Sequence, residues 1–164
     1  MGTAPGFRLR APAAADASAI ARVHVATWRA TYGHLIAESF FDDDALRRRE
    51  TMWREILVGQ DSARRLVVAE VDGTIVGFAH AGSPLGAHPV RGLQLYTLYV
   101  LPAHHGSGVG QALLDAVLGD EAAELWVARD NPRALGFYRR NGFGPDGATA
   151  DDEETGLAGL RLVR

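Results

Sequence analysis

Two histidines and three glycines lie close together in LYVLPAHHGSGVGQALLDAVL, residues 98–118, between an apolar run and an amphipathic run. Histidine can bind a metal or move a proton, and a glycine-rich turn before a helix exposes backbone N–H groups beside the positive end of the helix dipole. Because glycine has no Cβ atom, a pyrophosphate could approach the backbone between His105 and Gln111. Alternatively, the glycines only turn the chain and let the helix pack closely.

The residues around this loop argue against several other ligand sites. A Walker A loop and a lysine Schiff base both need lysine, and every basic residue of this chain is arginine. The dinucleotide fingerprint has the spacing Gly-x-Gly-x-x-Gly at an early strand-to-helix turn, whereas Gly106, Gly108 and Gly110 come late and are spaced Gly-x-Gly-x-Gly. His104 and His105 are adjacent and point in different directions, and no third ligand follows at a recognised spacing. We therefore expect an anion site and no metal.

One strand and two helices are predicted at the start of the chain. Residues 7–10 alternate as a strand does, and Asp16 is a suitable N-cap for a first helix that ends at Gly33. A second helix follows the acidic residues 42–44 and ends at Gly59. The apolar positions expected to face the core are Ile20, Val23, Thr27 and Ala30 in the first helix and Leu46, Trp53, Ile56 and Leu57 in the second.

The remaining elements place the loop inside a strand–helix–strand unit. Residues 64–82 form two β-rich runs around Asp72-Gly73, which is typical of a tight hairpin, and residues 92–102 form a third run. After the helix from Gly108, a short strand at 123–129 completes a parallel crossover. The inward face of that helix comprises Val109, Leu113, Ala116 and Val117. Asn131 then caps a helix with Pro132 at its first position, the acidic residues 146–156 are interpreted as one long loop, and residues 157–163 as a final strand.

Composition limits the class of protein. A chain of 164 residues is the size of one domain, residues 1–164, and it has no cysteine and a net charge of −3. Neither a signal peptide nor a membrane-spanning run is recognisable, so we expect a cytoplasmic protein that does not associate with membranes. The weak net charge also argues against a nucleic-acid partner.

A second stretch, WVARDNPRALGFYRRNGF at residues 126–143, makes the interpretation of the glycine loop more specific. Asn131 and Tyr138 share one helix face with Ala134 and Leu135, so they can touch one ligand, although a capping asparagine and a core tyrosine would explain each residue singly. In order and spacing, the two stretches resemble the GNAT superfamily of acyl-CoA-dependent N-acetyltransferases. The loop matches its Gln/Arg-x-x-Gly-x-Gly/Ala pattern except that His105 replaces the first residue. The second stretch matches its pattern Asn-x-x-Ala-x-x-Phe-Tyr-x-x-x-Gly-Phe.

The resemblance implies a role for each matching residue. The β-rich run before the loop would pair through its backbone with the pantetheine arm of acetyl-CoA, between two strands that splay apart, and the loop would hold the pyrophosphate. The Tyr138 hydroxyl would point at the thioester sulfur as the catalytic acid. The implied cofactor-binding residues are Leu98, Tyr99, Val100, His105, Gly106, Ser107, Gly108, Val109, Gly110, Gln111, Asn131, Ala134 and Phe137.

The acceptor side is less specific. Many family members have a glutamate where this chain has Gln94, so the general base stays unassigned and we expect a water-mediated one. Two-residue alternation predicts Tyr96 on the side of Gln94 and Tyr99 on the other. The residues expected to contact the acceptor are Trp28, Tyr32, Gln94 and Tyr96, although the aromatic residues also suit an ordinary core. Together with the acidic residues 151–154, which a solvated loop would also explain, they weakly favour a cationic acceptor.

The sequence thus predicts an α/β (α+β) GNAT fold, a mixed and mostly antiparallel sheet of about six or seven strands with helices on both faces. The predicted activity is direct transfer of acetyl from acetyl-CoA to a primary amine in a ternary complex. A non-catalytic acyl-CoA-binding sensor of the same fold is the alternative, and a nucleotide-binding oxidoreductase is a minor third interpretation. Small enzymes of this family often form homodimers.

Overall fold

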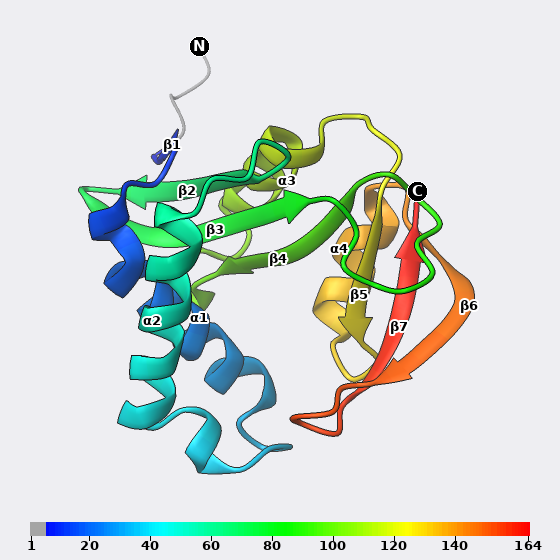
Figure 1. Cartoon of the computed structure of the whole chain (residues 1–164), viewed down its shortest axis with the longest axis horizontal. Helices are drawn as coiled ribbons and strands as arrows, with labels where there is room; N and C mark the ends of the chain where they lie inside the picture. The colour runs from blue at the N-terminus through cyan, green and yellow to red at the C-terminus, as the bar shows by residue number, and fades with distance from the viewer. Residues whose placement is uncertain (1–5) are drawn as a thin grey trace.

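A single seven-stranded sheet forms the centre of the molecule, in the order β1-β2-β3-β4-β5-β7-β6 (Figure 1). The computed structural model describes residues 6–164; the first five, on which the expectation about a signal peptide partly rests, lie outside the described part. The strands are β1 (Arg8–Arg10), β2 (Arg65–Val71), β3 (Thr74–Gly82), β4 (Gln94–Val100), β5 (Glu124–Ala128), β6 (Gly144–Asp151) and β7 (Ala158–Val163). β4 and β5 pair in parallel and the other neighbours are antiparallel, which confirms the predicted mixed sheet.

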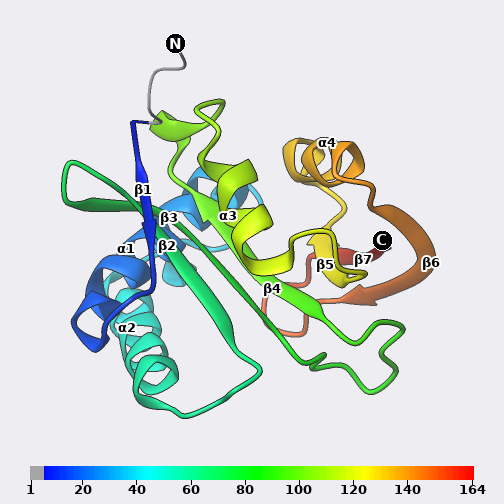
Figure 2. The ribbon, with the colours of Figure 1, turned by 90° about the horizontal axis from the view of Figure 1, so that it is seen from above.

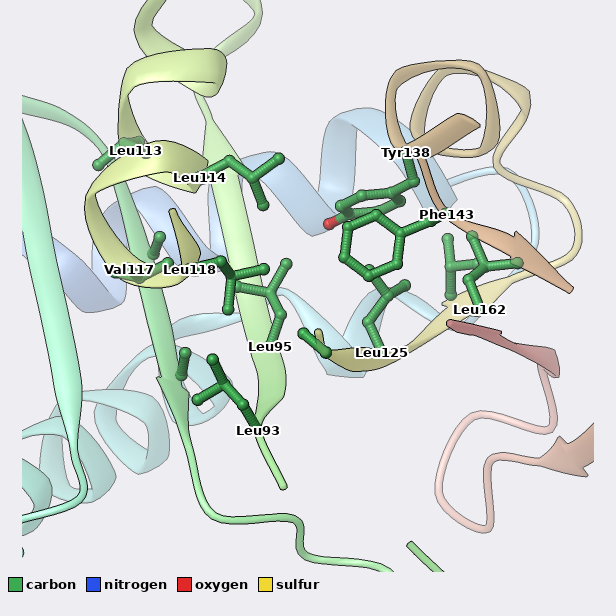
Figure 3. Packing of buried hydrophobic residues seen from close by; sticks show 14 of the residues in the cluster. Leu93, Leu95, Leu113, Leu114, Val117, Leu118, Leu125, Tyr138, Phe143 and Leu162 are labelled. Atoms are coloured by element: carbon green, nitrogen blue, oxygen red, sulfur yellow. The ribbon is translucent and has the colours of Figure 1, made fainter. Parts of the chain in front are cut away.

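Helices cover both faces of this sheet (Figure 2). On one face, α1 (Ala17–Tyr32) and α2 (Asp43–Val58) pack against Val68, Ile75 and Phe78. On the other, α3 (Val109–Leu118) and α4 (Pro132–Arg140) bury a cluster with the strands, part of which Figure 3 shows. Asp42 begins α2 as its carboxylate accepts from the Ala45 N–H at 2.8 Å. None of the helices within residues 6–164 is long and apolar enough to cross a bilayer.

Three local predictions were wrong. Ala30 and Ala116 are exposed; the buried face of α3 instead includes Leu114 and Leu118, which belong to the same buried cluster as Tyr138 and Phe143. Asp16 precedes α1 without capping it, since its carboxylate binds the Ala13 N–H and the Arg10 guanidinium.

The acidic stretch 146–156 was also misread, because its first part belongs to β6. Thr149 pairs with Leu160 and Asp151 pairs with Ala158, after a β-bulge between Pro145 and Thr149. β6 is an edge strand with mostly exposed side chains, so it needs no apolar face and leaves no periodic pattern in the sequence. Backbone pairing with β7 is what makes it a strand.

The feature that positions the site is the divergence of β4 and β5. These strands pair at Gln94↔Glu124 and Leu95↔Leu125 and then separate toward the end of β4 (Figure 1). The start of β5 is fixed by the buried Glu124 carboxylate, which accepts from the N–H groups of Val90 and Arg91 at 2.7 and 2.9 Å. The result is a parallel pair that opens into a V, as the resemblance implied.

Candidate active site

A large cleft of about 1060 Å³ occupies the opening between β4 and β5. Its lining includes the end of α1 on one face of the sheet and the glycine loop and α4 on the other face. The turn after β6, including Asp152 and Glu154, borders it as well. The large cleft therefore passes through the sheet where the two strands part.

The glycine loop presents unpaired backbone N–H groups at the start of α3. Gly106 and Gly108 have φ angles of 76° and 88°, a conformation that residues with a Cβ rarely adopt. Within the described residues, the N–H groups of His105 and Ser107 donate to carbonyls of the preceding turn, and the first bond of α3 runs from Ala112 to the Gly108 carbonyl. The N–H groups without a backbone acceptor are those of Gly106, Gly108, Val109, Gly110 and Gln111. At the positive end of a helix dipole, they form an anion-binding cradle.

Most of the residues predicted for the cofactor meet at the large cleft. Those that line it are Leu98, Tyr99, Val100, His105, Gly106, Gly108, Gly110, Gln111, Asn131, Ala134 and Phe137. Two do not: the Val109 side chain lies in the core, 1% exposed, and the Ser107 hydroxyl donates to the His104 carbonyl. These two residues can contribute to an anion site only through their backbone.

The edge of β4 offers backbone groups to the large cleft. The Leu101 N–H donates to the Val76 carbonyl at 2.9 Å. Because backbone groups alternate in direction along a strand, those of Leu101 and Tyr99 face β3. The backbone groups of Leu98 and Val100 consequently face the gap beside β5, as an added strand would require. The His105 ring contacts this edge, since its Nε2 lies 2.9 Å from the Val100 carbonyl oxygen.

Asn131 ties α4 to α1 across the large cleft. Its side-chain oxygen accepts from the Ala134 N–H at 3.1 Å and caps α4, and its side-chain amide donates to the Tyr32 hydroxyl at 3.1 Å. Burial raises the pKa of Tyr32, although the hydrogen bond from Asn131 lowers it. Both side chains thus hold the walls of the cleft in place, in addition to any contact with a ligand.

Tyr138 has the environment of a protonated hydroxyl. Its ring packs against Phe143, and its oxygen points away from Phe143 and Leu162 (Figure 3). Burial is the main reason that its pKa lies well above the ordinary value, and Tyr99 and Tyr32 raise it further. The hydrogen bonds among the described residues include none to this hydroxyl, and Tyr138 lines the large cleft. A proton donor therefore faces the opening between β4 and β5.

A small cleft of about 600 Å³ adjoins the large one on the α1 and α2 side. The two share Trp28, Tyr96, Thr97 and Tyr99. A β-bulge at Tyr96, opposite His80 and Ala81, explains this arrangement because it interrupts the alternation of β4 and turns Tyr96 to the face of Tyr99. The expectation that Tyr96 and Tyr99 lie on opposite sides was wrong for that reason.

Of the residues predicted for the acceptor, Trp28, Tyr32 and Tyr96 line the large cleft and Gln94 does not. Gln94 is 8% exposed at the start of β4, and its side-chain oxygen accepts from the Leu85 N–H at 2.8 Å. Sequence reasoning also missed Thr97. Its hydroxyl and the Trp28 indole nitrogen are buried at the junction of the two clefts without a hydrogen-bond partner among the described residues.

Comparison with known proteins agrees with this geometry. The model of the Acetyltransferase (GNAT) family matches residues 24–143, from the middle of α1 to the end of the α4 stretch. The chain belongs to the GNAT acetyltransferase family. This acetyltransferase is 29% identical over 154 residues to an uncharacterised N-acetyltransferase of Bacillus subtilis, YuaI, covering 90% of this chain and 83% of YuaI. A probable N-acetyltransferase of Mycobacterium tuberculosis is 29% identical over 149 residues, covering 87% of this chain and 83% of its own.

Solved structures show the same fold. The PaiA N-acetyltransferase of Thermoplasma acidophilum was solved in complex with coenzyme A. It superposes on this chain with a TM-score of 0.70 at 20% identity, and the match covers 96% of this chain and 98% of the PaiA chain. A related acetyltransferase of Corynebacterium glutamicum has a TM-score of 0.69 at 25% identity, covering 96% and 94%. Within residues 6–164, no three His, Asp or Glu side chains are placed to hold a metal ion.

Proposed function

We propose that the acetyltransferase moves the acetyl group of acetyl-CoA directly to a primary amine, with both substrates in the large cleft and Tyr138 as the acid. The observation that carries this proposal is the unpartnered, protonated Tyr138 hydroxyl facing the gap between β4 and β5. The free N–H groups of the glycine loop lie on the same side of the sheet and fit the pyrophosphate of the substrate. The coenzyme A complex of the Thermoplasma relative supports the same use of the fold.

The proposed reaction balances in one displacement. The neutral amine attacks the thioester carbonyl, the C–N bond forms, and the C–S bond breaks. The leaving thiolate takes a proton from the Tyr138 hydroxyl or shares a hydrogen bond with it, because burial keeps that hydroxyl protonated at neutral pH. The product amide loses its extra proton to water, which also returns a proton to the tyrosine.

Removing the proton from the acceptor ammonium is harder than supplying one to the leaving thiolate. An alkylammonium of pKa about 10.4 is neutral in roughly one molecule in 10³ at pH 7, which costs about 4 kcal/mol. Within residues 6–164, the carboxylates that line the large cleft are those of residues 151–154, at the end of β6 and in the turn after it, and none of them is hydrogen-bonded to Tyr138. We therefore assign the deprotonation to water at this end of the cleft.

Substitution of Tyr138 by Phe tests the proposal. The variant keeps the ring that packs on Phe143 and removes the hydroxyl, so kcat should fall about 100-fold or more while the Kd for acetyl-CoA stays within about threefold of wild type. Release of free thiol with a panel of primary amines measures kcat, and calorimetry measures Kd. Phe143→Leu is the matched control, since it loosens the same packing, keeps the hydroxyl and should retain most of kcat. Equal kcat in Tyr138→Phe and wild type would remove the acid role. Binding of acetyl-CoA with no thiol release for any amine would instead indicate the non-catalytic sensor.

A further inference from the structure

We infer that the small cleft binds a carboxylate of the acceptor, so that the acceptor is a primary amine that also carries a carboxylate. This inference rests on the proposed function, because it assigns the far end of the amine substrate. The small cleft and the large one share part of their lining, namely Trp28, Tyr96, Thr97 and Tyr99, so we place in the small cleft the far end of a molecule whose amine reaches the thioester. Its lining decides what that molecule carries.

His24 supplies one fixed hydrogen-bond donor. It is 5% exposed on α1, and its Nδ1 accepts from the Trp53 indole nitrogen at 3.1 Å, which places the proton of a neutral ring on Nε2. Burial, together with the nearby charge of Arg49, lowers the pKa of His24 to about 3, so the ring is neutral at physiological pH. Nε2–H makes no hydrogen bond to a described residue, and His24 lines the small cleft.

Arg49 supplies a positive charge beside this donor. It lies on α2, is half-buried, lines the small cleft and has no carboxylate within 4 Å among the described residues. Its recorded side-chain contact is with the Met52 sulfur at 3.8 Å. The charge of the Arg49 guanidinium acts on both His24 and Asp152, and it makes no ion pair within 4 Å among the described residues, so it can still bind an anionic group of the ligand. A carboxylate can accept from both.

The carboxylates that also line the small cleft are engaged elsewhere or lie at its boundary. Asp61 accepts from the Ala63 N–H, and Asp152 accepts from the N–H groups of Thr155 and Glu154. Burial would raise the pKa of Asp152, but those hydrogen bonds and the charge of Arg49 lower it, so it stays ionised. Asp152 and Glu154 border both clefts, where the ammonium of the acceptor would pass. The lining of the small cleft thus includes both a positive group, Arg49, and negative groups, Asp152 and Glu154, with which the two charges of a zwitterion can interact.

The junction of the clefts is lined by aromatic and polar side chains, Trp28, Tyr96, Thr97 and Tyr99. The Thr97 hydroxyl is buried and has no hydrogen-bond partner among the described residues. Burial raises the pKa of Tyr99, although the Trp28 indole lies close enough to the Tyr99 hydroxyl to lower it. From the junction, the acceptor would reach Tyr138 in one direction and Arg49 in the other.

Matched acceptors test the inference. Two pairs of amines are compared with acetyl-CoA as the donor: β-alanine with β-alaninamide, and 5-aminopentanoate with 5-aminopentanamide. Within each pair, the second compound has a carboxamide in place of the carboxylate. Thiol release gives kcat/KM for each amine. We expect the carboxylate in the better-fitting pair to be preferred by about 10- to 100-fold, the range for a hydrogen-bonded charge. Arg49→Met should bring this ratio close to one, whereas Arg49→Lys, which keeps the charge, should retain part of it. Arg48→Met, at the exposed neighbouring position outside both clefts, should leave it unchanged.

The outcomes separate the two proposals. If carboxamides are acetylated as well as carboxylates, or if Arg49→Met keeps the wild-type preference, the assignment of the small cleft is overturned and the proposed function stands. If no amine in the panel releases thiol although acetyl-CoA binds, the proposed function fails and this inference fails with it. A folded Arg49→Lys variant keeps the test decisive even if Arg49→Met does not fold.

Discussion

Acidification below the ordinary histidine pKa of 6.5 should destabilise the acetyltransferase through His24. The folded pKa of His24 is about 3, against an ordinary value of 6.5, because the ring is buried beside Trp53 and feels the charge of Arg49. As pH falls through 6.5, the unfolded chain binds a proton that the folded chain does not accept until about pH 3. The free energy of unfolding therefore falls by about 1.4 kcal/mol per pH unit within this window.

The size of this loss in unfolding free energy depends on how far the pH lies below the unfolded pKa of histidine. Between about pH 7.5 and about pH 5, His24 alone should cost roughly 2 kcal/mol. His80 acts in the same direction, because burial and the charge of Arg64 lower its pKa to about 4. Its greater exposure to solvent makes its contribution to the loss of stability smaller than that of His24. The acidic groups with lowered pKa values, such as Asp16 and Glu70, lose their contribution only at lower pH.

Urea unfolding at the two pH values, for wild type and His24→Gln, isolates this effect. The substitution lowers stability at both pH values because it removes the ring that accepts from Trp53, but it also removes the titration. The loss between the two pH values should be smaller in His24→Gln than in wild type by roughly 2 kcal/mol. An equal loss in both proteins would refute a buried, neutral His24 and with it the fixed Nε2–H donor of the small cleft.

Substitutions of Gly108, His105 and Asn131 test the large cleft, with Gly73→Val and Asn131→Ser as controls. Gly108→Val and Gly73→Val each force a residue with a Cβ into a left-handed conformation, with φ of 88° and 79°, and should each cost about 1–2 kcal/mol of stability; calorimetry should find acetyl-CoA binding lost in the first and kept in the second. His105→Ala should change acetyl-CoA affinity less than about tenfold, because it removes a ring contact and no free N–H; a 100-fold loss would contradict this. Asn131→Ala should lower thermal stability by about 1–2 kcal/mol through loss of the α4 cap and the Tyr32 contact, with Asn131→Ser, which keeps a cap, losing less.

The fold could be predicted largely because its signals are local. Asp72-Gly73 marks the β2–β3 turn, where the structure has φ angles of 47° and 79°, and Asn131 and Pro132 mark the start of α4. The parallel crossover from β4 through α3 to β5 follows from element order. β6 escaped prediction because an exposed edge strand is held by backbone pairing and carries no apolar pattern.

The candidate site likewise has a part that local motifs predict and a part that depends on how distant elements pack. The glycine loop and the α4 face are contiguous motifs, so their residues could be named from the sequence. The junction of the two clefts depends on the bulge at Tyr96, which no residue type announces and which turns Tyr96 to the face of Tyr99. His24 and Arg49 meet only because α1 and α2 pack side by side, and the sequence signal for His24 was limited to a histidine within an apolar stripe.

The assignment of the glycine loop as the pyrophosphate site is tested most directly by backbone amide NMR during titration with coenzyme A. We predict downfield shifts of the amide protons of Gly106, Gly108, Val109, Gly110 and Gln111, which have no backbone acceptor, and smaller shifts for His105 and Ser107, which already donate. Saturating coenzyme A binding that leaves these five amides unmoved, with the largest shifts elsewhere in the chain, would contradict the assignment.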